Sequence, residues 1–339
     1  MLCEGLRKLA KGASRKNIQL LYCTDCNLEE VPEEFGRMEK LGLIDFANNK
    51  ISKLYPMPNV APVQVYFDHN QIEAFPIDEA SRSYCKMMDM ETFSASHNRL
   101  TKFPNIFYSN GFTISSVNLS NNLIDEVEAG FRGIRVTTLT LTGNRFTSFP
   151  KRLINGEENR NNPTYDSSIA YIVFRANNLQ GFEEDAFKGT NSKDLMSLDL
   201  SYNHLSKFPK EFSAMNMPYL YGIDVSNNEF SSFPYEPFDA YTLTIYAVRA
   251  QRDKNGRRCL REWPTGVFQH TGLRGLYLGS NDLRTINDTI SYLIYYLDIS
   301  DNPNITFDAS AVCANWKAGL YYLIYDKTQN IINCEEMLR

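Results

Sequence analysis

The 339-residue sequence predicts an α/β repeat solenoid, with a parallel sheet on one face and irregular, 3-10 and polyproline II segments on the other. The first observation is a shared frame. LDLSYNHLSKFP from Leu198, IDVSNNEFSSFP from Ile223 and LTLTGNRFTSFP from Leu139 all read apolar-x-apolar-x-x-Asn-x-apolar-x-x-aromatic-Pro. The second is that Asn returns at one frame position, and the third is the closing aromatic-proline pair. One such unit buries almost no apolar surface alone, so the units are expected to stack.

The start of each frame predicts a short strand. Leu198 and Leu200 alternate with Asp199, so the leucines are expected to face the core and the aspartate to face solvent. Further along the frame, aromatic side chains are expected to form a second buried column, made of Phe75, Phe103, Phe149, Phe182, Phe208, Phe233 and Trp263. The proline that follows most of these aromatics favours extended backbone and ends any strand or helix there.

The Asn position predicts a structural ladder along the stack. A side-chain amide both donates and accepts hydrogen bonds, so it can satisfy turn backbone groups that the strands leave unpaired. Loss of one amide is expected to leave such groups buried and unpaired, at about 1–3 kcal/mol each. The ladder consists of Asn49, Asn70, Asn98, Asn122, Asn144, Asn177, Asn203, Asn228, Asn281 and Asn302.

These repeats resemble the leucine-rich repeat family over nearly the whole chain. The resemblance implies a curved horseshoe whose concave face is the parallel sheet and whose convex side is irregular. It predicts one domain spanning residues 1–339, with an N-terminal cap over 1–20, about twelve repeats over 21–308 and a C-terminal cap over 309–339. Both end segments depart from the frame, as the terminal segments of a solenoid must.

The seven cysteines are an odd number, so at least one is unpaired within the chain. Cys23 and Cys26 have metal or redox spacing, but the repeat frame explains both, as an inward residue and a residue of the Asn column. A disulfide with Cys3 or another cysteine, or a metal site, are the alternatives. A capping disulfide is expected between Cys313 and Cys334. The sequence does not pair the remaining two, Cys85 and Cys259.

Charge and motif content exclude several classes of function. The net charge of −5 and the lack of a basic stripe argue against nucleic-acid binding. No apolar run is long enough to insert into a membrane. His69 and His97 could share a ligand or metal with Asp68, but these residues are an incomplete metal-ligand set. No catalytic triad, carboxylate pair or phosphate loop stands out, so we expect no enzyme activity, no cofactor and no metal.

The strand face and its rim are expected to bind a protein or peptide partner. Ile245 and Ala247 are expected to point inward, which places Tyr246 on the outer face. Tyr and Arg dominate the binding energy of many interfaces, and Tyr also stacks on sugars, so a surface carbohydrate-binding or adhesion protein is the alternative. The candidate residues are Tyr22, Tyr66, His69, His97, Arg175, Tyr202, Tyr246, Arg249 and Tyr277.

A cationic stretch interrupts the frame after residue 247, where about seven extra residues are expected to replace the simple Asn turn. At its centre Asn255-Gly256 is a strong signal for a tight turn, so residues 248–262 are expected to form a β-hairpin on one rim. The hairpin is expected to carry Arg252, Lys254, Arg257 and Arg258 into solvent, as a structural loop or as a contact for the partner.

A finer resemblance concerns the Phe-Pro repeats, the Trp263-Pro264 repeat and WKAGLYYLIYDKTQN near the C-terminus. These features are similar to secreted or surface-anchored leucine-rich repeat proteins of Bacteroides-type gut bacteria. The resemblance implies an extracytoplasmic location, with the signal or anchor outside this segment.

Overall fold

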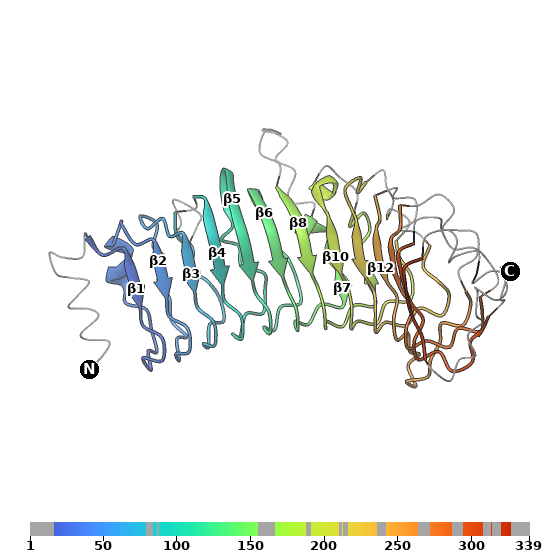
Figure 1. Cartoon of the computed structure of the whole chain (residues 1–339). Helices are drawn as coiled ribbons and strands as arrows, with labels where there is room; N and C mark the ends of the chain where they lie inside the picture. The colour runs from blue at the N-terminus through green and yellow to red at the C-terminus, as the bar shows by residue number, and fades with distance from the viewer. Residues whose placement is uncertain are drawn as a thin grey trace. The chain divides into compact units, whose positions relative to one another are not determined.

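The computed structural model describes residues 17–78, 84–86, 88–154, 167–187, 191–209, 212, 216–235, 242–263, 272–286, 294–307, 313 and 320–326. The chain divides into two compact units. Unit 1 comprises Met1–Asn177 with Lys188–Ser192, and unit 2 comprises Asn178–Phe187 with Lys193–Arg339. Within each unit, successive turns contribute short strands to a parallel sheet, as the sequence predicts (Figure 1). The expectation of one domain over 1–339 stays a prediction.

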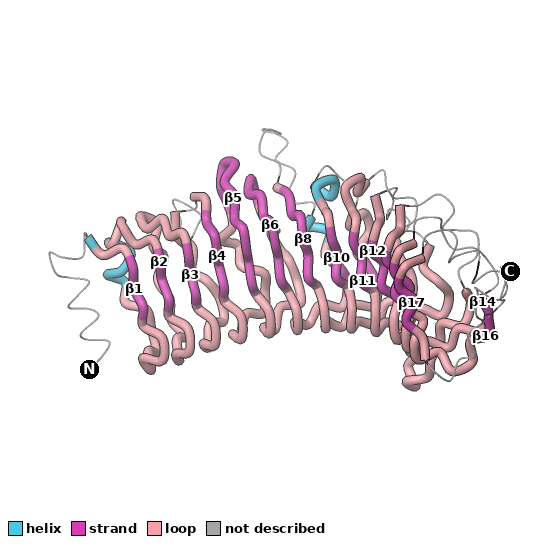
Figure 2. The backbone as a smooth tube through the Cα atoms, viewed as in Figure 1, coloured by secondary structure: helices cyan, strands magenta, loops and turns pink. Residues whose placement is uncertain are grey.

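Unit 1 contains seven parallel strands in chain order, β1 (Leu20–Tyr22), β2 (Leu43–Asp45), β3 (Gln64–Tyr66), β4 (Met90–Ser94), β5 (Tyr108–Asn118), β6 (Arg132–Thr140) and β8 (Ser168–Val173). The short strand β7 (Ser148–Phe149) lies outside this sheet. In the described residues of unit 1, helix is confined to short segments such as the 3-10 turn η2 (Glu33–Arg37) and the single turn α2 (Lys151–Ile154) (Figure 2). The described segments that lead from one strand to the next are therefore mostly irregular, as the prolines after the aromatic residues predict.

Unit 2 continues the same design with β10 (Ser197–Asp199), β11 (Gly222–Asp224), β12 (Ile245–Ala247), β13 (Gly275–Tyr277), β15 (Tyr296–Asp298) and β17 (Tyr322–Ile324). A second small sheet pairs β14 (Thr285–Ile286) with β16 (Thr306–Phe307). The remaining elements are β9 (Gly181–Phe182) and the 3-10 turn η3 (Asn191–Asp194). Strand β17 lies within the predicted C-terminal cap, and pairs with β15 in the same register as the repeat strands do. Most of that cap and residues 1–16 of the predicted N-terminal cap lie outside the described residues.

The core follows from the alternation within each strand. In unit 2 the central residues of five strands are register partners and all are at least 97% buried: Leu198, Ile223, Tyr246, Leu276 and Leu297. The aromatic column packs behind them, with rings in contact from repeat to repeat, such as Phe182 on Phe208 at 6.0 Å between centroids. Each turn contributes the same two layers, so neighbouring turns bury one another.

The prediction for Tyr246 is wrong by one residue of register. Tyr246 aligns with Ile223, is fully buried and donates its hydroxyl to the carbonyl of Pro234 at 3.0 Å. Ile245, expected to be inward, is 44% exposed. The inward pair is therefore Tyr246 and Val248, since a buried Tyr remains favourable when its hydroxyl finds a partner.

The corrected register shows that Gln251 takes the place of Asn in this repeat. Its side-chain Oε1 accepts the amide of Phe230 at 3.1 Å, and its Nε2 donates to the carbonyls of Val225 and Arg249 at 2.9 and 3.0 Å. A glutamine therefore makes the same type of contacts as the ladder asparagines. The extra residues follow this turn and do not replace it, which corrects the expectation for the cationic stretch.

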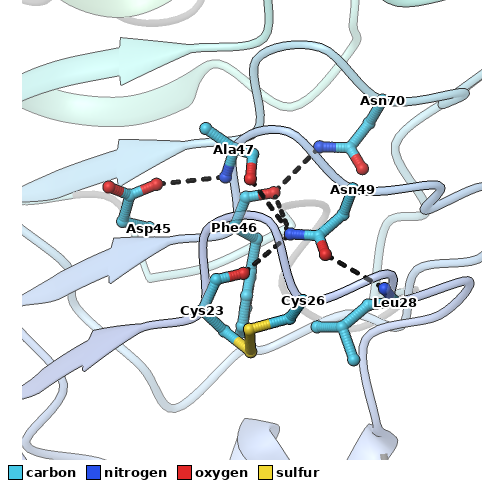
Figure 3. The surroundings of a disulfide bond; sticks show 8 residues. All are labelled: Cys23, Cys26, Leu28, Asp45, Phe46, Ala47, Asn49 and Asn70. Atoms are coloured by element: carbon cyan, nitrogen blue, oxygen red, sulfur yellow. Dashed lines mark hydrogen bonds between the residues drawn. A yellow bond between two sulfur atoms is a disulfide. The ribbon is translucent and has the colours of Figure 1, made fainter. Parts of the chain in front are cut away.

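The ladder amides join each turn to the turn before it. Asn49 donates to the carbonyls of Phe46 and Ala47 in its own turn and to that of Cys23 in the preceding turn, and accepts the amide of Leu28 (Figure 3). The residue before each ladder position has a left-handed backbone with φ between 51° and 68°: Asn48, His69, His97, Asn121, Gly143, Ala176, Tyr202, Asn227, Ala250, Ser280 and Asp301. This conformation reverses the chain so that the amide points inward.

The cysteines differ partly from expectation. Cys23 is buried at its inward frame position and forms a disulfide with Cys26, an alternative that the sequence left open (Figure 3). Cys313 is buried and disulfide-bonded, and its partner lies outside the described residues, as do Cys3 and Cys334. The pairing of Cys313 with Cys334 thus stays a prediction. Cys85 and Cys259 are free.

Close packing between turns makes one glycine indispensable. A Cβ added to the buried Gly130 would overlap the backbone carbonyl of Arg152, which cannot rotate away as a side chain could. We expect Gly130→Ala to lower the free energy of unfolding by roughly 3 kcal/mol, measured by guanidinium denaturation. Gly181→Ala is the control, because a Cβ there would meet nothing within 4 Å. Equal stability of the two variants would contradict this packing.

Candidate recognition surface

The outer strand faces of the two units differ in chemistry. In unit 1 the outward residue at the end of each strand is, in register order, Tyr22, Asp45, Tyr66, Ser94, Asn118, Thr140 and Val173. In unit 2 the same position carries Asp199, Asp224, Ala247, Tyr277, Asp298 and Ile324. At this position unit 1 therefore offers mainly hydroxyl, amide and isolated aromatic groups, whereas unit 2 offers three carboxylates and the ring of Tyr277.

Exposed and half-buried tyrosines gather on and just before strands β13, β15 and β17 of the unit 2 sheet. Tyr277, Tyr296 and Tyr322 follow one another on β13, β15 and β17, with ring centroids 4.9 and 6.0 Å apart. Just before β15 and β17, Tyr295 and Tyr321 stack at 5.0 Å and are 49% and 65% exposed. We call these five residues the tyrosine cluster.

Such a cluster is unusual for a solvated surface, because each ring could bury a large apolar area. Ring contacts within the cluster fix the side chains, so little conformational entropy would be lost on binding a partner. Tyr277 was predicted at an outward strand position. Tyr295, Tyr296, Tyr321 and Tyr322 were missed, although the paired tyrosines of LIYYLDI and LYYLIYD, each just before an inward leucine, carry the signal.

Arg249 lies beside the cluster and is held in place from two sides. It occupies the position after Val248 where neighbouring repeats have Ser201 and Ser226. Its guanidinium reaches across two repeats to pair with buried Asp298, with 2.7 Å between Nη2 and Oδ2. It also lies over the ring of Tyr277, with 4.6 Å from Cζ to the ring centroid. Arg249 was predicted as a contact residue, and the structure fixes its side chain on the outer face of unit 2.

A hollow of about 300 Å³ opens between Arg249 and the first strands of unit 2. Gly222 and Ala247 form part of its floor because they carry little side chain, and its walls include Asp199, Tyr221, Asp224, Ile245 and Tyr277. Asp199 and Asp224 are direct register partners on β10 and β11. Each accepts the backbone amide of the serine two residues later, at 2.9 and 2.8 Å.

The surroundings of Asp224 disfavour its charged form. Burial raises the pKa of Asp224 above its ordinary value, the neighbouring carboxylate of Asp199 raises it further, and Ser226 and Arg249 act in the opposite direction. Among the described residues neither carboxylate has an ion-pair partner at the distance of the Arg249–Asp298 contact. Negative charge is therefore held in a partly buried hollow without full compensation.

This charge has a testable cost to stability. The pKa of Asp224 is higher in the folded protein than in the unfolded chain, so ionisation of this carboxyl favours unfolding. The destabilisation is absent below the ordinary pKa of 3.8, where the carboxyl is protonated in both states. It develops as pH rises from there through the pKa of the folded protein. We expect Asp224→Asn, which keeps the acceptor for Ser226, to be more stable than the parent at pH 7.5 and to lose this advantage near pH 4. Chemical denaturation at both pH values measures the gap. Asp45→Asn is the control, because the register partners of Asp45 are Tyr22 and Tyr66.

The remaining candidate residues are dispersed. Tyr22 is exposed on β1, Tyr66 is half-buried on β3, and Arg175 is exposed after β8, all in unit 1. His69 and His97 are exposed at left-handed turn positions and stack with their ring centroids 4.1 Å apart. Asp68 accepts hydrogen bonds from Ser94 and Ser96 and so serves the turn.

Tyr202 occupies the same kind of turn position in unit 2 and is 47% exposed. It lies on the loop after β10, whereas the tyrosine cluster lies on β13 to β17 and just before them. Two pairs from the predicted set of contact residues thus lie together in the described part of the chain, His69 with His97 in unit 1 and Arg249 with Tyr277 in unit 2.

The cationic stretch forms a small hairpin. Arg252 and Arg258 form an antiparallel bridge, and Asp253 accepts the amides of Asn255 and Arg257 at 2.8 and 2.9 Å. Gly256 has the positive φ of 74° that the turn signal predicts. The backbone therefore follows the expected hairpin.

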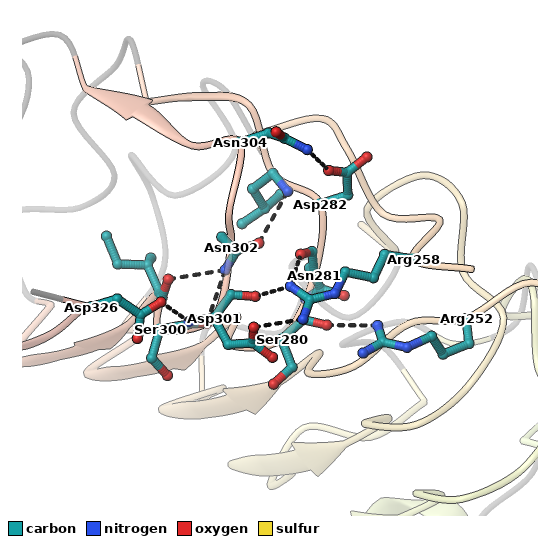
Figure 4. A network of polar contacts seen from close by, with 12 residues as sticks. Arg252, Arg258, Ser280, Asn281, Asp282, Ser300, Asp301, Asn302, Asn304 and Asp326 are labelled. Atoms are coloured by element: carbon teal, nitrogen blue, oxygen red, sulfur yellow. Dashed lines mark hydrogen bonds and ion pairs between the residues drawn. The ribbon is translucent and has the colours of Figure 1, made fainter. Parts of the chain in front are cut away.

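Two of its four cations point back onto the stack and not into solvent. Arg252 donates to the carbonyl of Ser280 at 2.7 Å, and Arg258 donates to the carbonyl of Asn281 at 2.9 Å and pairs with Asp301 (Figure 4). The hydrogen bond from Arg258 lowers the pKa of Asp301. Lys254 and Arg257 are exposed. Half of the cationic charge thus binds turn carbonyls of the next repeats, which corrects the expectation for Arg252 and Arg258.

Other chemistry is weakly represented in the parts of the chain that the structure describes. Burial raises the pKa of the Cys85 thiol to about 12, so this thiol is unreactive in the folded protein. Within the same residues there is no group of three or more His, Cys, Asp or Glu side chains arranged to hold a metal. None of the described helices has the length and apolar character required to cross a bilayer.

Comparisons with known proteins agree with the fold. The Leucine Rich Repeat family profile matches residues 194–215. A leucine-rich repeat protein from Bacteroides thetaiotaomicron is 36% identical with a TM-score of 0.80, over 92% of this chain and 38% of that chain. One from Bacteroides eggerthii is 33% identical with a TM-score of 0.86, over 98% of this chain and 56% of that chain.

This chain therefore spans roughly half the length of those two proteins or less. The Drosophila Toll–Spatzle complex shares the fold alone, at 21% identity and a TM-score of 0.63, over 87% of this chain and 37% of that chain. No curated protein matches the sequence. The repeat frame, the parallel sheets with their amide ladder and the similarity to the two Bacteroides proteins lead to one conclusion: the chain belongs to the leucine-rich repeat family.

Proposed function

We propose that this chain is a non-catalytic recognition scaffold that binds a protein or peptide partner through the strand face and rim of unit 2. The tyrosine cluster is the observation that carries the proposal. Five contacting tyrosines at the end of one sheet provide rigid amphipathic rings, the kind of side chain that contributes most binding energy at interfaces. Arg249, fixed by Asp298 and Tyr277, adds a preorganised polar contact at the edge of the cluster.

The leucine-rich repeat fold commonly serves protein–protein interaction, and the Toll structure above is a complex with Spatzle. An extracytoplasmic or cell-surface location belongs to the same proposal. It is supported by the Cys23–Cys26 disulfide and the disulfide-bonded Cys313, because such bonds persist in oxidising compartments.

Site-specific photocrosslinking tests the proposal directly. We expect benzoylphenylalanine in place of Tyr321 to form adducts with a protein partner in the native culture of the source organism. The control is the same residue in place of Lys207, which is exposed in unit 2 on the segment that returns after the Asn203 turn. Equal adducts at both positions, or none at position 321, would contradict a partner on the tyrosine cluster.

Carbohydrate binding is the second candidate, because a ring face as exposed as that of Tyr321 can also stack on a sugar. The two candidates differ in competition. Free oligosaccharides should leave the crosslink at position 321 unchanged if the partner is recognised as a protein. Loss of the crosslink on addition of a sugar, together with glycan-array binding by the purified chain, would favour the surface carbohydrate-binding reading.

A further inference from the structure

The proposed function leaves the hollow beside the tyrosine cluster without a role. We propose that this hollow receives the ammonium or guanidinium group of a basic side chain on an extended partner segment, whose neighbouring apolar residues lie on the tyrosine cluster. The inference rests on the proposed function and specifies the chemistry of the partner.

Charge is the first argument. Asp199 and Asp224 are adjacent in register and both face the hollow, and each gives one oxygen to a turn amide. A carboxylate accepts hydrogen bonds at two oxygens, so capacity remains on both side chains for a donor from outside. A cation between them would offset their mutual repulsion, whereas a neutral group would not.

Arg249 does not already fill this role. Its Nη2 pairs with Asp298 on the opposite side at 2.7 Å, and its guanidinium lies over Tyr277. Asp298 is itself 95% buried, so this pair is held in place and its arginine is not free to swing onto Asp199. The acidic side of the hollow is therefore left to a cation of the partner.

Shape is the second argument. The small residues Gly222 and Ala247 leave a space of about 300 Å³, which is enough for the end of a Lys or Arg side chain. Tyr221 and Ile245, 37% and 44% exposed, stand on its walls and offer apolar surface to the methylene groups of such a side chain. Cation and stem would thus find complementary surroundings in one place.

The position of the hollow is the third argument. It lies on β10 to β13, and the tyrosine cluster begins at Tyr277 on β13 and continues through β15 and β17. Tyr277 belongs to both surfaces, so one extended segment can cross from the hollow to the cluster. The described strands of unit 1 carry no equivalent pair at this register position, because the outward Asp45 stands between Tyr22 and Tyr66.

Peptide selection on the whole chain tests this inference. A displayed library of random dodecapeptides is selected for binding to the parent, and peptides that also bind the Asp199→Asn, Asp224→Asn double variant are removed. In this variant the asparagine oxygens can still accept the amides of Ser201 and Ser226, but the two charges are lost. We expect the selected peptides to share a Lys or Arg with apolar or aromatic neighbours. Their synthetic copies should bind the double variant roughly tenfold to a hundredfold more weakly by calorimetry, and Asp45→Asn as tightly as the parent. Replacing the shared basic residue by Gln should cause a similar loss.

The outcomes separate the two proposals. Selected peptides without a shared basic residue, or equal affinity for the parent and the double variant, overturn the inference. If those peptides still lose binding when Tyr321 and Tyr322 become alanine, the proposed function stands without it. Failure to select any peptide also overturns the inference, because it requires an extended segment. Absence of a crosslink at position 321 would then remove the proposed function as well.

Discussion

Replacing Asn228 with leucine should lower the free energy of unfolding by roughly 3 kcal/mol or more, although the two side chains are similar in size. The Asn228 side chain is 98% buried, and its Nδ2 donates to the carbonyls of Leu200 and Val225, both at 3.0 Å. Its Oδ1 accepts the amide of Leu205 at 2.9 Å. Leucine would leave the amide of Leu205 buried without a partner, at a cost of about 1–3 kcal/mol. The carbonyls of Leu200 and Val225 would each lose one hydrogen bond, worth about 0.5–1.5 kcal/mol, and keep those from Asn203 and Gln251.

Urea or guanidinium denaturation followed by circular dichroism measures the loss. Asn178→Leu is the matched control, because Asn178 is an exposed asparagine next to the ladder position of Asn177. It should change the unfolding midpoint little, since surface substitutions usually stay within about 0.5 kcal/mol. If Asn228→Leu were as stable as Asn178→Leu, the amide ladder would not be what joins the turns.

Changing Tyr321 and Tyr322 together to alanine should weaken partner binding by roughly two to three orders of magnitude. The two rings are 65% and 51% exposed, and they contact each other and Tyr295. A partner that covers them would bury large apolar areas with little loss of side-chain freedom. Because both side chains are largely exposed already, the stability of the fold should be nearly unchanged.

Calorimetry or surface plasmon resonance with the photocrosslinked partner measures this loss. The Tyr321→Phe, Tyr322→Phe variant separates ring area from hydroxyl hydrogen bonds and should retain most of the affinity. Tyr22→Ala removes a similarly exposed tyrosine, 62% exposed on the strand face of unit 1, and should have little effect. A large loss with Tyr22→Ala and none with the double variant would move the recognition surface to unit 1.

The fold could be predicted from the sequence because its rule is local. Each Asn with its flanking apolar pair specifies one strand and one turn, and the match repeats often enough to fix the register. The rule failed where two registers were nearly equivalent. IYAVRAQ permits either Ile245 or Tyr246 to point inward. Extra residues were expected in place of the Asn turn, whereas this repeat builds the turn with Gln251.

The recognition surface was harder to predict, because it depends on alignment between repeats and not on any one of them. Asp199 and Asp224 lie 25 positions apart in the chain, and only strand pairing makes them neighbours. The contacts of Arg258 could not be predicted for the same reason. A run of arginines in the sequence indicates a solvated patch, and only the folded stack places the turns of Asn281 and Asp301 beside it. Tyr295 and Tyr321 were missed because their exposure follows from their place just before the strands.

The Cys23–Cys26 bond has a consequence for how the stack comes apart. Each turn of a solenoid is stabilised mainly by its contacts with the neighbouring turns. The first described turn carries a covalent bond to Cys26, which stands at the ladder position where other turns have a side-chain amide. The disulfide-bonded Cys313 lies near the last described strand, whereas the free Cys85 and Cys259 lie between these points. Reduction should therefore loosen the turn of Cys23 and the segment around Cys313 before it disturbs the turns between them, whose described cysteines are free.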